Sequence, residues 1–144
     1  WLDSYDIYDE QGETLYTVKG VLAWGHCLKV FDRDDNYLGM VKEKVLTFLP
    51  RFEVHLGDSY AGVIQKEFTF FKPRFEVELN GWRVEGDWLE WNYEILDGDR
   101  LVASVGKELW RWTDTYQIEV ERDEDALMAL MAVLAIDAAN CSKG

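Results

Sequence analysis

The sequence predicts a mainly β protein, a closed antiparallel barrel of about 12 strands around a central hydrophobic helix at the C-terminus. Three observations support this fold: short segments alternate strictly between apolar and polar residues, one stretch occurs three times, and an apolar run closes the chain. Alternation with one polar face is typical of half-buried antiparallel strands. We expect one domain over residues 1–144, with the strands in residues 1–122 and the helix over about residues 124–140.

An internal repeat predicts a series of β-hairpins. Residues 41–54 align without gaps on residues 64–77 and on residues 105–118, and the first two copies share the word Pro-Arg-Phe-Glu-Val. Residues 1–7 and 112–118 also share the pattern W-x-D-x-Y-x-I. Together these echoes divide the chain into repeated segments, and one hairpin for each segment accounts for the spacing. The segments start near Tyr5, Leu28, Phe52, Phe75, Tyr93 and Tyr116. Turn-forming pairs such as Asn80-Gly81 and Asp97-Gly98 lie between strand segments and supply the positive φ angles that tight hairpins need.

Alternation also places individual strands. Tyr116, Ile118 and Val120 fall on one face of an extended chain, and the polar residues between them fall on the other. Residues 89–95 show the same pattern from Leu89 to Ile95 and predict a strand over that range.

The pattern changes after Arg122 and predicts a buried helix. Residues 123–125 are Asp-Glu-Asp, which offers an N-cap and negative charge where the helix dipole favours it. Residues 126–136 are apolar throughout and rich in good helix formers. A helix without a polar face must be buried on every side. A barrel of about 12 strands leaves a lumen that such a helix can fill, which favours a barrel over a two-layer sandwich.

Composition and charge limit the partners and the compartment. The net charge of −13 repels phosphate backbones, so we expect no nucleic-acid partner. The apolar runs are shorter than the roughly 20 residues of a membrane-spanning helix, so we expect no transmembrane segment. Cys27 and Cys141 are the only cysteines and lack metal-binding spacing, which predicts reduced thiols in a cytoplasmic protein.

The sequence contains none of the common catalytic or cofactor-binding motifs. The G-x-S-x-G, G-x-G-x-x-G, phosphate-loop and H-E-x-x-H patterns are all absent. His26 and His55 each stand alone, so neither predicts a metal site. We therefore expect no enzyme activity, no catalytic residues, no metal and no cofactor.

One set of acidic residues has the spacing of a calcium-binding loop. Asp32, Asp34, Asn36 and Glu43 occupy positions one, three, five and twelve of that spacing. Position six is Tyr37, where the calcium loop requires Gly for its sharp turn. A polar hairpin loop is the alternative interpretation, and we favour it.

Several segments in the right order resemble the LURP-one-related family. They are residues 68–74, 84–87, 112–118 and 134–138, and the likeness extends over nearly the whole chain. That family belongs with the tubby C-terminal-like and phospholipid-scramblase-like proteins. The resemblance implies a barrel of about twelve strands around a central hydrophobic helix. The chain is most similar to short bacterial members, which are single domains of unassigned function.

The absence of catalytic motifs favours a non-catalytic binding or scaffold domain whose partner is an unknown protein or an amphiphilic ligand. The scramblase-like resemblance implies an alternative, a membrane-peripheral lipid-binding protein. Lys72 and Arg74 are the candidate ligand-binding residues, because they adjoin Phe70 and Phe71, and cations beside aromatic rings can meet a lipid headgroup or an acidic peptide. The alternative interpretation of this segment is a structural turn around Pro73.

Three further charged positions bear on ligand binding. Lys42 and Lys44 form a second cationic pair, but Glu43 lies between them in the sequence. Asp137 is a candidate buried acid, because it interrupts the apolar helix near its C-terminal end, where the helix dipole disfavours an anion. If Asp137 is buried, it needs a hydrogen-bond donor or its pKa rises; at the mouth of a barrel it would be solvated and without a role.

Overall fold

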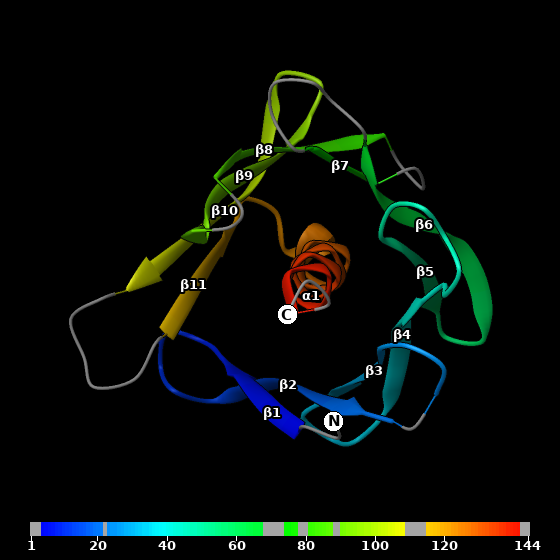
Figure 1. The fold of residues 1–144 in the computed structure, drawn as a ribbon. Coiled ribbons are helices and arrows are strands. Elements are labelled where there is room, and N and C mark those ends of the chain that lie inside the picture. The colour runs from blue at the N-terminus through cyan, green and yellow to red at the C-terminus, as the bar shows by residue number, and fades with distance from the viewer. Residues whose placement is uncertain are drawn as a thin grey trace. The chain divides into compact units, whose positions relative to one another are not determined.

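The computed structural model describes residues 4–21, 23–67, 74–77, 81–87, 90–108 and 115–141. For residues 5, 67, 74–77, 107–108, 115–116 and 140–141, it describes the backbone alone. The chain divides into two compact units, Trp1–Val63 (unit 1) and Ile64–Gly144 (unit 2). Each unit is described by itself, and Figure 1 shows the strands of each following one another in chain order.

Unit 1 is an antiparallel meander. Its strands are β1 (Ser4–Tyr8), β2 (Thr14–Gly20), β3 (Cys27–Asp32), β4 (Tyr37–Glu43), β5 (Arg51–Leu56) and the first part of β6 (Ser59–Glu67). Strands β1 to β5 pair in chain order. Buried residues alternate along two of these strands, with Gly39 and Val41 on β4 and Phe52 and Val54 on β5. The predicted alternation is therefore confirmed on β4 and β5.

Unit 2 combines a second antiparallel meander with the C-terminal helix. It contains the end of β6, then β7 (Arg74–Val77), β8 (Trp82–Asp87), β9 (Asn92–Asp97), β10 (Arg100–Glu108) and β11 (Thr115–Val120). A 3-10 turn, η2 (Asp123–Asp125), and the helix α1 (Ala126–Cys141) follow. Strands β6 to β11 pair in chain order, and α1 contacts β11.

The sequence repeat corresponds to three hairpins with one register. The first and last residues of each copy are cross-strand partners: Val41 with Val54, Ile64 with Val77, and Val105 with Ile118. The common register explains why the copies align without gaps. The prediction of one hairpin for each repeated segment is confirmed for the first five segments, which hold the pairs β1–β2, β3–β4, β5–β6, β7–β8 and β9–β10.

Helix α1 is buried on every side, as its composition predicts. Every residue from Met128 to Ile136 is buried, and the large side chains of Leu130 and Leu134 are only 4% and 3% exposed. The helix begins at Ala126, slightly later than predicted, because the acidic residues before it form the η2 turn. Arg122 holds the N-cap position of η2 without a side-chain capping bond, and the three acidic residues form the turn directly before α1, so the predicted negative charge at the helix start is confirmed.

Two predictions about the strands differ from the structure. Strand β9 begins at Asn92 and not at Leu89, because Trp91 has a φ of 55° and this left-handed conformation breaks the extended chain. The structure assigns eleven strands to its described residues, against about 12 predicted. The closure of these strands into a barrel and the single domain over residues 1–144 stay predictions.

Candidate binding surface

Unit 1 has two ends that carry different connections. The β2–β3 and β4–β5 loops lie at one end, which we call the loop end, because Cys27 at the start of β3 pairs with Lys42 near the end of β4. The β1–β2, β3–β4 and β5–β6 turns lie at the other end, which we call the turn end. There Tyr8 pairs with Thr14, and the Gly57 amide donates to the Leu38 carbonyl at 2.8 Å.

The turn end is acidic. Its turns carry one cation, Arg33, and seven carboxylates, namely Asp9, Glu10, Glu13, Asp32, Asp34, Asp35 and Asp58. The Oδ1 atoms of Asp9 and Asp32 each accept two backbone amides, all at 2.9 Å, which closes the two loops as Asx-type turns. Hydrogen bonds from the Asn36 side chain and backbone hold the pKa of Asp32 below its usual value.

The calcium-like spacing does not form a site in this fold. Asp32 and Asn36 belong to the β3–β4 turn, whereas Glu43 ends the extended strand β4 and therefore lies at the loop end. The four residues are not brought together, and the polar hairpin loop is the correct interpretation. In the described part of the chain, no group of three or more His, Cys, Asp or Glu side chains is placed to hold a metal ion.

The loop end is apolar. Trp24 on the β2–β3 loop is 85% exposed, and on the β4–β5 loop Phe48 is 93% exposed and Leu46 is fully exposed. Val45 is partly exposed beside them. We call these four residues the loop cluster. Single exposed apolar side chains are ordinary, but several large ones on adjacent loops are typical of an interaction site.

Backbone bonds hold the two loops in place. The Oε1 atom of Glu43 accepts the His26 amide at 3.0 Å, and the Glu43 amide donates to the His26 carbonyl at 2.7 Å. A side chain at Gly25, whose φ is +83°, would lie 2.9 Å from that same Oε1 atom and 3.0 Å from Val45 Cγ1, so the loops touch there. Within the second loop, the Thr47 hydroxyl donates to the Leu49 carbonyl at 2.8 Å.

A row of lysines crosses the strands near the loop end. Lys19 on β2 and Lys29 on β3 are direct cross-strand partners. Lys42 pairs with Cys27, which lies two residues before Lys29 on the same face of β3. Lys44 follows Lys42 by two residues. We call Lys19, Lys29, Lys42 and Lys44 the lysine stripe. Like charges directly opposite each other destabilise a sheet, so the Lys19–Lys29 pair is a cost of this arrangement.

Neighbouring groups confirm where these ammonium groups lie. Lys19 Nζ is 4.9 Å from the centre of the Phe31 ring, within cation–π range. Burial raises the pKa of the Cys27 thiol, and the charges of Lys42 and Lys29 oppose that rise, which places both lysines near the sulfur. Lys44 Nζ lies 3.2 Å from Glu53 Oε1, and this contact lowers the pKa of Glu53.

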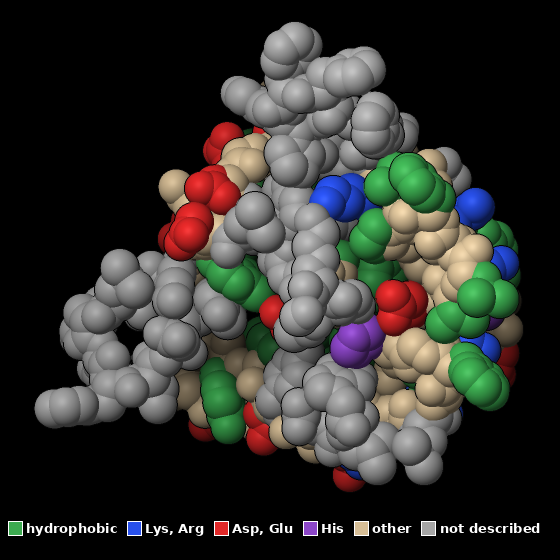
Figure 2. All heavy atoms as spheres, viewed as in Figure 1, with side chains coloured by type: hydrophobic (Ala, Val, Ile, Leu, Met, Phe, Trp, Pro, Cys, Tyr) green, Lys and Arg blue, Asp and Glu red, His purple; other side chains and the backbone are tan. Residues whose placement is uncertain are grey.

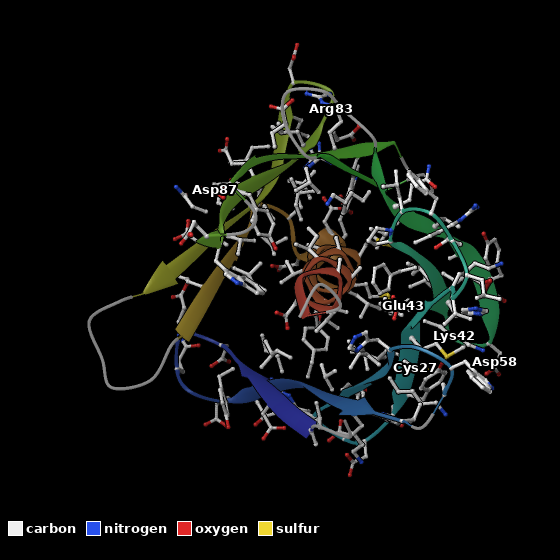
Figure 3. The ribbon with its side chains drawn as sticks, in the orientation of Figure 1. Cys27, Lys42, Glu43, Asp58, Arg83 and Asp87 are labelled. Atoms are coloured by element: carbon white, nitrogen blue, oxygen red, sulfur yellow. The ribbon has the colours of Figure 1, made fainter. Side chains whose placement is uncertain are left out.

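Glu43 does not interrupt the stripe. Successive side chains of a strand point to opposite faces, and Figure 3 shows Lys42 and Glu43 projecting from opposite sides of β4. The carboxylate of Glu43 is engaged with the His26 backbone, and the acid that borders the stripe on its own face is Glu53, the cross-strand partner of Lys42. Figure 2 shows hydrophobic and basic side chains, with acidic ones among them, on the right of the view, where β4, β5 and β6 lie in Figure 1.

Residues 1–137 match the model of the family described as LURP-one-related. The chain belongs to the LURP-one-related family. It is similar to a protein of Bacillus subtilis (strain 168) that bears the name "Uncharacterized protein YxjI", with 27% identity over 136 residues, which cover 94% of this chain and 84% of that protein. No solved structure matches the chain. The resemblance seen in the sequence is thus confirmed at the level of the family.

The sites predicted for this LURP-one-related chain lie elsewhere. Lys72 falls outside the described residues, and Arg74 begins β7 with its side chain also outside the description. Asp137 is half-buried on α1. Burial, and after it the charge of Asp137, raises the pKa of Tyr93, which places the two side chains near each other inside unit 2.

Sequence reasoning missed the loop cluster and half of the lysine stripe. A signal for the cluster was present in the repeat, because Phe48 aligns with Phe71 and Trp112, which puts an aromatic residue at one position of all three copies. The pairing of Lys19 with Lys29 depends on strand register, and neither residue belongs to a motif. In the part of the chain that the structure describes, no helix has the length and apolar character needed to cross a bilayer.

Proposed function

We propose that this LURP-one-related chain is a non-catalytic binding domain that holds an anionic partner along the lysine stripe. The observation that carries the proposal is the pairing of Lys19 with Lys29 in a chain whose net charge is −13. Two lysines are direct cross-strand partners although acidic residues are plentiful, and their ammonium groups lie over the rings of Phe31 and Tyr37. A partner that bears negative charge would remove this repulsion on binding.

The chemistry of the stripe suits recognition of anions that carry apolar or aromatic groups. Aromatic rings flank its cations, since Phe31 lies under Lys19, and Tyr37 has its ring centre 5.9 Å from Lys29 Nζ. Ammonium groups on flexible stems bind anions as point charges, and the rings hold the stems and offer apolar contact. We assign no catalytic step to this surface.

A water-soluble polyanion tests the proposal without involving lipid. We expect a short labelled poly-glutamate peptide to bind the chain at low salt and to be released as salt is added. Replacing both lysines of the pair, Lys19→Gln with Lys29→Gln, should weaken binding about tenfold, on the scale of surface ion pairs.

Arg33 supplies the matched control, because it is an exposed cation at the acidic turn end of the same unit. The Arg33→Gln variant should bind the peptide as the unaltered chain does. Equal affinity for the unaltered chain, the double lysine variant and the Arg33 variant would overturn the proposal.

The loop cluster favours a second candidate function, peripheral binding to a lipid surface. Exposed Trp, Phe and Leu side chains beside lysines are the composition of segments that lie at a membrane–water interface. This function agrees with the scramblase-like resemblance, but it uses residues other than the predicted Lys72 and Arg74. The exposure of Trp24 and Phe48 supports it.

We also propose the closed barrel of about twelve strands around α1 as the complete fold. Burial of α1 on all sides supports it, because an apolar helix needs apolar cover on every face. Paired cysteines in β1 and β11, the first and last strands, test closure. A disulfide should form readily between neighbouring strands, and its failure to form at every register tried would favour an open sheet.

A further inference from the structure

We propose that unit 1 docks on an anionic lipid bilayer with its loop end. In this arrangement Trp24, Leu46 and Phe48 enter the headgroup region, the lysine stripe meets lipid phosphates and carboxylates, and the acidic turn end faces water. The inference rests on the proposed function, because it names the partner of the anion-binding surface.

The shape of the loop cluster favours a bilayer over a protein groove. Its side chains project from the tips of two loops, and three of them are almost wholly exposed. Convex apolar tips need a soft apolar medium to enter, and the interfacial region of a bilayer accepts Trp, Phe and Leu in this way. Lys42 and Lys44, the lysines of the stripe nearest these tips, can keep their ammonium groups among the headgroups while their stems lie on apolar groups.

The charge of the two ends supports both the lipid class and the orientation. Residues 19–31 and 38–53, which form the loop end and its flanking strands, contain five Lys or Arg residues and two acids, Glu43 and Glu53, whereas the chain as a whole has 28 acidic and 15 basic residues. The carboxylate of Glu43 is held by the His26 amide. An anionic surface therefore attracts the loop end and repels the acidic turn end, which turns the unit into the docking orientation.

The loops are organised before any partner binds. The two bonds between Glu43 and His26 join one loop to the other, and the Lys44 amide donates to the Arg51 carbonyl at 2.9 Å to close the second loop. Leu46 has a φ of 65°, a left-handed conformation that is unfavourable for a residue with a side chain. In water, a fully exposed Leu side chain on a strained backbone is unfavourable. In a bilayer the same backbone conformation already holds the side chain in the position needed for insertion.

Co-sedimentation with vesicles tests the inference with the whole chain. We expect binding to vesicles of equimolar phosphatidylcholine and phosphatidylserine at low salt, and much weaker binding to phosphatidylcholine alone. The triple variant Trp24→Ser, Leu46→Ser, Phe48→Ser should lose binding to the anionic vesicles by at least about tenfold, because it removes the inserted apolar area.

The turn end offers a matched control. Tyr8, Leu56 and Tyr60 are also exposed apolar residues of unit 1, and they lie at the opposite end of its strands. Replacing these three with Ser should leave vesicle affinity within about twofold of the unaltered chain. Circular dichroism and urea unfolding of both triple variants establish that each is folded.

The outcomes separate this inference from the function on which it rests. If the loop-cluster variant binds anionic vesicles as tightly as the unaltered chain, insertion is wrong and only the lysine stripe is engaged. If the chain binds poly-glutamate but not vesicles, the inference is overturned and the proposed function stands. A dimer that the loop-cluster variant cannot form, without vesicle binding, would identify a second copy as the partner and also overturn the inference. Failure with both probes removes both proposals.

Discussion

Glu43 binds the backbone of His26 twice. Its Oε1 atom accepts the His26 amide at 3.0 Å, and its own amide donates to the His26 carbonyl at 2.7 Å. One residue at the end of β4 thereby joins the β2–β3 loop to the β4–β5 loop. The apolar tips of both loops depend on this residue for their relative position.

We expect Glu43→Ala to lower the free energy of unfolding by about 1–2 kcal/mol, because a charge-assisted hydrogen bond is lost and the His26 amide loses its acceptor. Glu43→Gln keeps an acceptor oxygen and should lose less. Urea unfolding measures both variants. Identical stability of the two would contradict the role given to the carboxylate.

Gly25 is expected to tolerate no side chain. Its φ of +83° and the close approach of Glu43 Oε1 both oppose Gly25→Ala. Gly12 has nearly the same φ, +81°, but nothing lies within 4 Å of a side chain there, so Gly12→Ala reports the backbone cost alone. That cost is about 1–2 kcal/mol. Gly25→Ala should destabilise by more, and an equal loss in the two variants would show that the loops do not touch.

Tyr93 predicts a dependence of stability on alkaline pH. Burial, with a further contribution from Asp137, raises its pKa in the folded chain, whereas the unfolded chain releases the proton near pH 10, its ordinary value of about 10. The contribution of Tyr93 to the free energy of unfolding is therefore fully present below about pH 10. It falls as the pH rises further, because the unfolded state then releases the Tyr93 proton and the folded state does not. Tyr93→Phe should remove this part of the fall.

The same variant has an effect at neutral pH. The Tyr93 hydroxyl is buried and makes no hydrogen bond to any residue that the structure describes. Tyr93→Phe should therefore raise the free energy of unfolding by about 1 kcal/mol. Tyr60→Phe, at an exposed position, should change little. Urea unfolding at pH 7 and above pH 10 measures both effects, and a loss of stability in Tyr93→Phe would indicate a partner for the hydroxyl.

The helix α1 is expected to contribute strongly to stability. Met131 is fully buried, so Met131→Ala leaves a cavity and should cost about 2–5 kcal/mol. Leu127 lies on the same helix but is only half-buried, and Leu127→Ala should cost less. Thermal unfolding of the two variants gives the comparison. Similar melting temperatures would mean that α1 is not the dry centre of its unit.

Much of the fold follows from patterns that are local in the sequence. Val41 and Val54 begin and end one copy of the repeat, and their pairing recurs as Ile64 with Val77. A hairpin register depends on the number of residues between two strands, so equal spacing gives equal pairing. The burial of Leu130 and Leu134 follows in the same way from the absence of a polar face on the helix.

The candidate site was much less accessible to sequence reasoning. Residues 89–95 alternate as a strand does, which predicted a strand from Leu89. Strand β9 begins only at Asn92, because the left-handed φ of Trp91 forms a turn that overrides this short alternating pattern. Asp32 and Glu43 have calcium-loop spacing, yet an extended strand separates them. In both places the path of the chain, and not the residue pattern, decided the outcome.

The sequence by itself determined the antiparallel hairpins, their shared register and the dry C-terminal helix, because each depends on periodicity between near neighbours. Only the tertiary structure decided that Lys19 faces Lys29 and that Trp24 lies at the same end as Phe48. These pairs lie on different hairpin elements, and their proximity is set by how successive strands align. A chain that is acidic on average thereby acquires one basic, apolar end, and no count of charges along the sequence contains that information.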